Sequence, residues 1–227
     1  PGRKPGEYPS AGPLPQVFDV WRAGAPTLDF LAPDIYFPNF VEWVGAYDRP
    51  GNPVFVPEVG RASWATMASN AFYTIGAHDA MGYSPFSIEH APEDGALGQA
   101  YEVLHQLTPL ILEHQGRGTM AGVHPIVSFD GTVDDSPQVI QLGDFVFEVS
   151  FFDPWTPRDR QETESHGGLF IALDDETFVV AGSGLTVTFT PHGPGDPIAG
   201  IDRIEEGTFV DGVWRRGRVL NGDQSHQ

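Results

Sequence analysis

The spacing of apolar residues changes once along the chain, near residue 120, and this change limits the possible folds. Up to about residue 118, short apolar runs alternate with segments in which apolar residues recur every three or four positions. From about residue 123 the period becomes two, and clusters of turn-forming residues separate the runs. The pattern therefore predicts two units, an α/β unit over residues 1–122 and an all-β unit over residues 123–227.

In the first unit, the pattern predicts three strands that alternate with three helices. The expected strands are 28–36, 54–58 and 81–86, and the expected helices are 40–47, 63–75 (with Ser63 as N-cap) and 96–114. Strands that alternate with helices pair in parallel through right-handed crossovers. Ligands bind at the carboxyl ends of such strands, so functional residues are expected directly after each strand.

In the second unit, short strands and tight turns predict an antiparallel β-sandwich. Turns are expected at 173–177 and at 209–214, where Asp211-Gly212 is a typical hairpin dipeptide. The polar segment 153–167 is expected to be a surface loop. Strands are expected within 139–152, 168–173, 177–182 and 185–190.

The charge balance excludes several partners. The chain has 12 Lys and Arg against 31 Asp and Glu, a net charge of −19, which disfavours nucleic acid and anionic membrane surfaces.

The chain has no run of about 18 apolar residues, as a membrane helix needs, and Pro1–Gln16 lacks the apolar core of a signal peptide. Cysteine is absent and the histidines are scattered, so neither a metal nor a cofactor is expected. An uncharged substrate such as a sugar is compatible with this composition.

Glu58 is the sharpest candidate for chemistry, because it directly follows the apolar run of the second strand and precedes Val59-Gly60. A carboxylate held at a strand end in an apolar cleft suits a nucleophile or a general base. The same pattern is also typical of an acid that merely begins the next loop.

The segment Pro53–Gly60, Pro-Val-Phe-Val-Pro-Glu-Val-Gly, resembles the nucleophile strand of family 35 glycoside hydrolases, the β-galactosidase type. Leu31–Tyr36 and Gly82–Glu89 resemble the sixth and eighth barrel strands of bacterial members of that family. Ile204–Trp214 and Leu220–His226 resemble the last strands of the β-sandwich that follows their barrel. The resemblance implies a fold made of the last βα units of a (β/α)8 TIM barrel and an antiparallel β-sandwich.

The resemblance implies a retaining mechanism on terminal β-galactosides, with Glu58 as nucleophile and a carbohydrate as partner. The second carboxyl group, the acid/base, follows the fourth barrel strand of the family in an Asn-Glu pair. None of the four Asn residues here precedes a Glu, so this chain lacks the acid/base and is expected to be inactive alone. A complete barrel takes about 250 residues, whereas about 120 precede the β-unit, so strands one to five are expected to be missing. Relatives of this type favour a periplasmic or secreted location, a cytoplasmic one also being possible; the oligomeric state is open.

Four further residues are candidates for the same site. Tyr36 matches the aromatic hydroxyl that orients the nucleophile in this superfamily, and a strand-capping Tyr is the alternative. Asn39 could contact a sugar hydroxyl, although we favour a helix cap. Trp64 and Phe86 could line the sugar site, while Glu89 is expected to be a solvated acid.

The sequence also allows two other interpretations. The β-unit could be a carbohydrate-binding or interaction module attached to a catalytically dead remnant. Alternatively, the chain could be an incomplete product whose exposed strand edges cause aggregation or dimerisation.

Overall fold

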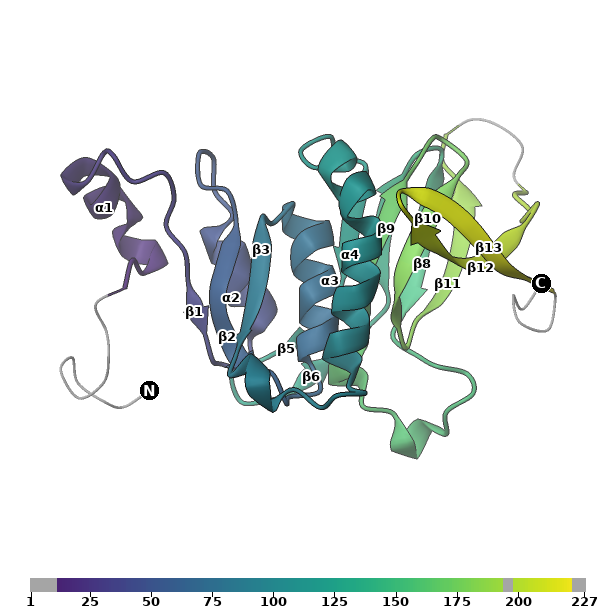
Figure 1. The fold of residues 1–227 in the computed structure, drawn as a ribbon, viewed down its shortest axis with the longest axis horizontal. Helices are drawn as coiled ribbons and strands as arrows, with labels where there is room; N and C mark the ends of the chain where they lie inside the picture. The colour runs from purple at the N-terminus through teal and green to yellow at the C-terminus, as the bar shows by residue number, and fades with distance from the viewer. Residues whose placement is uncertain (1–11, 194–197, 222–227) are drawn as a thin grey trace.

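The computed structural model describes residues 12–193 and 198–221, so part of Pro1–Gln16 and of the Leu220–His226 resemblance lies outside the described residues. Figure 1 shows the elements in successive layers. A parallel sheet lies on one side, helices α3 and α4 lie in the middle, and the antiparallel strands lie on the other side. The chain is therefore a mixed α/β protein with several antiparallel sheets.

The parallel sheet has the order β1-β2-β3, and both pairs are parallel, as the alternation of strands and helices predicts. The strands are β1 (Asp34–Ile35), β2 (Phe55–Arg61) and β3 (Gly82–Phe86). The expected strand 28–36 is wrong in its length. Pro33 has no N–H for a ladder, and the Asn52 side chain instead bonds both the N–H and the C=O of Leu31, at 2.8 and 3.0 Å.

Two of the three expected helices have the predicted bounds, α2 (Phe40–Tyr47) and α4 (Ala96–His114). Helix α3 (Met67–His78) starts later than predicted, and Ser63 is not its N-cap. The reason is a tight turn before the helix, in which the Trp64 N–H donates to the Arg61 C=O at 2.8 Å. The other helical segments described before β4 are η1 (Pro15–Val17), α1 (Phe18–Gly24) and η2 (Ile88–His90).

Helices α2 and α3 cover one face of the parallel sheet, where Val56 and Val59 of β2 are buried together with Val44 of α2. On the opposite face, Pro57 of β2 and Ser84 of β3 are exposed. Among the described residues, the edge strands β1 and β3 pair only with β2. The sheet is thus open at both edges and covered on one face.

Two antiparallel sheets, β10-β9-β4 and β11-β8-β7, face each other around a phenylalanine-rich core that includes Phe147 and Phe170. This is the expected sandwich, and the turns at 173–177 and 209–214 are confirmed. Segment 153–167 is not wholly loop, because it contains η3 (Arg158–Arg160) and η4 (Thr163–Ser165). The strands are β4 (Met120–Val123), β5 (Ile126–Val127), β6 (Val133–Asp134), β7 (Gln138–Leu142), β8 (Phe145–Ser150), β9 (Gly167–Ala172), β10 (Phe178–Ser183), β11 (Thr186–Pro191), β12 (Ile204–Val210) and β13 (Val213–Leu220).

One buried cluster joins the two units. Helices α3 and α4 pack on the outer face of β9, where Phe72, Leu107 and Ile171 belong to one buried cluster. Two glycines bring α3 against β4: a methyl group at Gly76 would lie 2.5 Å from the Ala121 carbonyl oxygen, and one at Gly122 would lie 2.5 Å from the Tyr73 carbonyl oxygen. The boundary at 122/123 stays a prediction. Helices α3 and α4 precede it in the sequence, but they pack both on the parallel sheet and on β9.

Candidate functional site

Strand β2 is irregular at Glu58, which lies in its middle, because the strand continues to Arg61 and does not end at residue 58 as expected. The register between β2 and β3 shifts between Val56 and Val59, which leaves Pro57 and Glu58 without regular partners on β3. Pro57 explains this shift, because a proline in a central strand cannot donate to the ladder and is tolerated only at a bulge. A bulge changes the direction of the side chain that follows, and here that side chain is Glu58.

Tyr36, which directly follows β1, meets Glu58 in the middle of the neighbouring strand β2. The Tyr36 hydroxyl donates to Oε1 of Glu58 at 2.6 Å, so the predicted contact between these two residues is present. Partial burial and the bond to Glu58 raise the pKa of Tyr36 well above its usual value of 10. The phenol therefore remains protonated near neutral pH, and it fixes one carboxylate oxygen while leaving the other for chemistry.

Asp34 is a site residue that the sequence analysis does not single out. It is the register partner of Glu58 on β1, so the two side chains lie on the same face of adjacent parallel strands. Burial, followed by the charge of Glu58, raises the pKa of Asp34. The sequence does carry a signal for it, because Asp34 and Tyr36 are two positions apart and thus share one face of a strand.

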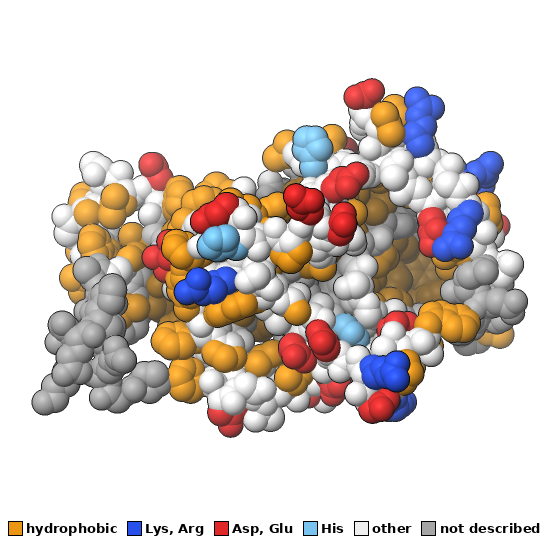
Figure 2. All heavy atoms as spheres, turned by 60° about the horizontal axis from the view of Figure 1, so that its bottom comes forward, with side chains coloured by type: hydrophobic (Ala, Val, Ile, Leu, Met, Phe, Trp, Pro, Cys, Tyr) orange, Lys and Arg blue, Asp and Glu red, His pale blue; other side chains and the backbone are white. Residues whose placement is uncertain are grey.

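Phe86 closes the other side of the strand ends. It is the last residue of β3, it is exposed, and its ring lies edge-on to Tyr36 with centroids 6.2 Å apart. The rim thus has aromatic side chains from both edge strands on either side of the part of β2 that carries Glu58. Figure 2 shows hydrophobic side chains spread over the half of this face that the α/β elements form.

Trp64 follows β2 in the loop that leads to α3, and its side chain is held against the backbone of Gly60. Gly60 has a positive φ of 42°, and a methyl group there would lie 2.7 Å from the indole ring. Trp64 remains 43% exposed and lines a cavity of about 440 Å³, as Tyr36 does. Glu58 does not line this cavity, which lies beside the carboxylate rather than over it.

Asn39 is at the N-cap position of α2, but the predicted cap is wrong. Its side chain makes no capping bond, and its Nδ2 instead donates to Glu42 Oε2 at 2.7 Å. The residue is 4% exposed and is not part of the cavity lining, so the structure does not place it where a substrate in that cavity would meet it. The bond to Glu42 uses the amide nitrogen, which is a donor, so it does not satisfy Oδ1, which has no hydrogen-bond partner among the described residues.

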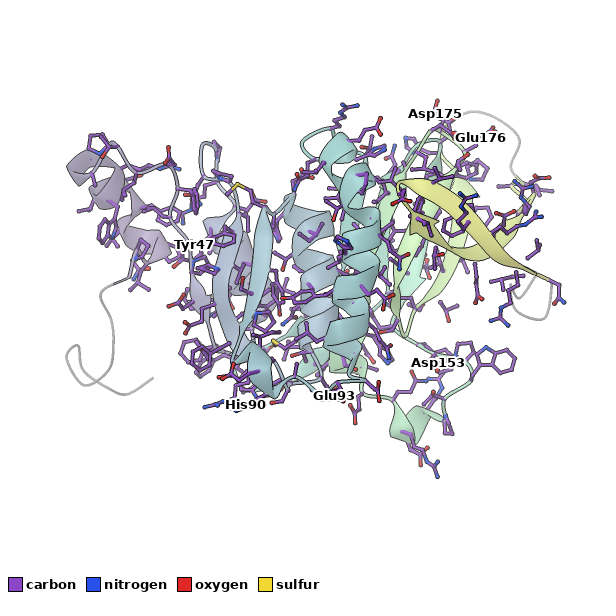
Figure 3. All side chains as sticks on the ribbon, in the orientation of Figure 1. Tyr47, His90, Glu93, Asp153, Asp175 and Glu176 are labelled. Carbon is purple, nitrogen blue, oxygen red and sulfur yellow. The ribbon has the colours of Figure 1, made fainter. Side chains whose placement is uncertain are left out.

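Other acidic groups lie elsewhere or form no cluster. Glu89 is in η2, close to the labelled His90 and Glu93 at the lower end of the α/β part, whereas Asp175 and Glu176 are at the tip of the β9–β10 turn at the opposite end (Figure 3). No group of three or more His, Asp or Glu side chains in the described ranges could hold a metal ion. Within those same ranges, no helix has the length and apolarity needed to span a bilayer.

The comparisons with known proteins concern the second half of the chain. Residues 97–227 match a family described as a domain of unknown function, DUF5597. The match begins inside α4, so it includes most of that helix as well as the sandwich. No curated protein matches the chain. Because the family match covers more than half of the residues, the chain belongs to the DUF5597 family.

Proposed function

We propose that this chain is the C-terminal portion of a retaining glycoside hydrolase that cleaves terminal β-galactosides. The observation that carries the proposal is the 2.6 Å bond from the Tyr36 hydroxyl, directly after β1, to Glu58 on the adjacent strand β2. A nucleophilic carboxylate needs a fixed direction and an ionised state, and a hydroxyl that donates to it supports both. The sugar and the barrel assignment come from the resemblance of Leu31–Tyr36, Pro53–Gly60 and Gly82–Glu89 to family 35.

The open parallel sheet supports the same proposal. Its helices cover one face, while the other face and both edges are free among the described residues. In a (β/α)8 barrel, that second face is the barrel interior, and further strands would pair with β1 and β3. Those strands would supply the proton donor, since Asp34 flanks Glu58 on the next strand and does not face it across a bound sugar.

In the proposed first step, a Glu58 carboxylate oxygen attacks the anomeric carbon of the galactosyl group. The bond from that carbon to the leaving oxygen breaks, and the leaving oxygen takes the electron pair and a proton from the acid. A leaving group that is stable as an anion needs no proton. The acid-free chain can therefore be tested for this step alone.

The test uses the chain with dinitrophenyl 2-deoxy-2-fluoro-β-galactoside, which releases dinitrophenolate and leaves a long-lived glycosyl-enzyme. We expect a mass increase of one fluorogalactosyl group, mapped to Glu58 by peptide sequencing, and none in Glu58→Gln. Glu89→Gln is the matched control, because Glu89 follows the neighbouring strand β3, and it should be labelled like the wild type.

A longer protein with five strand–helix units restored before this chain tests turnover. It should hydrolyse an aryl β-galactoside, and Glu58→Ala should abolish this activity. Added azide should then restore cleavage of an activated substrate and give the α-galactosyl azide, the signature of a lost nucleophile. Undiminished hydrolysis by Glu58→Ala would overturn the assignment of Glu58.

A further inference from the structure

The cavity beside Glu58 has walls from both parts of the chain. Its volume is about 440 Å³. One wall is formed by the segments that follow β1 and β2, including Phe37 and Trp64. The opposite wall is formed by the β5–β6 hairpin, with Val127 and Val133, and lies within the DUF5597 match. The two walls also touch directly, because the rings of Phe37 and Phe129 are 5.4 Å apart.

Part of the apolar lining of this cavity is aromatic and suits the flat face of a sugar ring. Tyr36, Phe37 and Trp64 all line it, and each is more than a third exposed although large. Small-molecule sites usually have volumes of about 300–1,000 Å³ and combine aromatic walls with a few polar groups. The cavity lies at the lower end of that range, which fits one or two sugar rings better than a long chain.

Two polar side chains of the cavity, Asn70 and Glu164, offer acceptor atoms to a ligand. Asn70 lines the cavity, is 3% exposed, and its Oδ1 has no hydrogen-bond partner among the described residues. A buried acceptor without a donor is costly, so a ligand that brings a hydroxyl group there would be stabilised. Glu164 offers a second acceptor, and the lining residues include neither Lys nor Arg. Hydroxyl donors without negative charge match this set, whereas an anionic ligand does not.

We propose that this cavity is a subsite for a second, neutral sugar ring of the substrate, and that the DUF5597 domain contributes to it through the β5–β6 hairpin. The inference rests on the proposed function, because Tyr36 both lines the cavity and bonds Glu58. A sugar joined to the galactosyl group at Glu58 would thus reach the cavity past Tyr36. The β-domain would then help to select the substrate.

Calorimetric titration of the full chain with lactose, cellobiose, xylobiose and galacturonic acid tests the proposal. We expect at least one neutral disaccharide to bind and galacturonic acid not to bind. Trp64→Ala, which removes one aromatic wall, and Val133→Trp, which fills the cavity from the hairpin side, should each weaken binding about tenfold or more. Trp155→Ala, which removes an exposed indole outside the cavity, should leave the affinity unchanged. Thermal melts confirm that each variant is folded.

The outcomes separate this inference from the proposed function. Binding that both cavity variants weaken supports the subsite, even where Glu58 is never labelled by the fluorogalactoside. Labelling of Glu58 together with no disaccharide binding, or with binding that neither cavity variant changes, overturns the subsite and leaves the proposed function standing.

Discussion

Protonation of one buried imidazole is expected to weaken the contact between α3 and β4. His124 directly follows β4, is 2% exposed, and its Nδ1 lies 2.7 Å from the Pro125 carbonyl oxygen. A carbonyl can only accept, so Nδ1 carries the hydrogen and Nε2 is the bare nitrogen. This Nε2 faces Ser69 Oγ of α3 at 3.2 Å. Burial in this position lowers the pKa of His124 from 6.5 to about 4.

Because the pKa of His124 is lower in the folded chain than in the unfolded chain, the free energy of unfolding depends on pH. Between pH 6.5 and about 4, the unfolded chain binds a proton at His124 and the folded chain does not, so stability falls as the pH falls. A difference of about 2.5 pKa units at 1.36 kcal/mol each gives roughly 3 kcal/mol, which is lost in full once the pH reaches about 4. Domains of this kind have a total stability of about 5–15 kcal/mol, so the loss is measurable.

Urea unfolding at pH 7.5, 6.5, 5.5 and 4.5 measures this effect in the wild type and in His124→Gln. The carboxylates also titrate in this range, so the informative quantity is the difference between the two proteins. We expect the wild type to be the more stable at pH 7.5, and its advantage to shrink by roughly 2–3 kcal/mol by pH 4.5. His105→Gln, at an exposed position of α4, is the control and should follow the wild type. Parallel pH profiles for the wild type and His124→Gln would refute the reasoning.

Two further expectations concern the helical layer and the site. Gly76→Ala should lower the free energy of unfolding by about 1–3 kcal/mol, because its methyl group would clash with the Ala121 carbonyl. Gly98→Ala on α4 adds a methyl group that makes only an ordinary contact, 3.9 Å from the Glu93 carbonyl oxygen, and should be neutral or stabilising by up to about 1 kcal/mol in the same urea titration. Equal effects of the two substitutions would contradict the packing argument. Tyr36→Phe should slow fluorogalactosyl labelling of Glu58 about tenfold, because it removes a bond to a charged group, which contributes about 1.5–3 kcal/mol. An unchanged labelling rate would show that the bond does not assist the step.

The elements that the sequence predicts well are those whose own periodicity decides their structure. The apolar stripe of 96–114 continues for five turns, and α4 has those bounds. Segment 28–36 is just as apolar, yet only Asp34–Ile35 joins the sheet, because a distant side chain, Asn52, bonds the backbone of Leu31. Likewise, 139–152 has one apolar pattern but forms two strands, because the chain reverses at Gly143, which has a positive φ of 53°. The spacing of apolar residues reveals neither a bond from a distant side chain nor a reversal of the chain.

The candidate site could be predicted in part. Glu58 and Tyr36 each follow an apolar run, and parallel strands bring such positions together. Asn39 shows where this reasoning stops, because it lies at the N-cap position of α2 but its side chain donates to Glu42 and makes no capping bond. The cavity could not be predicted, because its two walls are more than 60 residues apart in sequence, as Trp64 and Val133 are, and only the packing of α3 on β4 brings them together.

This packing links the position of the DUF5597 domain to the geometry around Glu58. Glycines at positions 76 and 122 let the backbones of α3 and β4 approach so closely that neither element can shift without a clash. The hairpin β5–β6 follows β4 after two residues, and Glu58 precedes α3 by a short loop. A rigid contact between α3 and β4 therefore fixes the distance from the hairpin wall to the carboxylate. Under the proposed function, the domain would thus be part of the site's framework, because a hairpin on a flexible tether would not hold a sugar ring in register with Glu58.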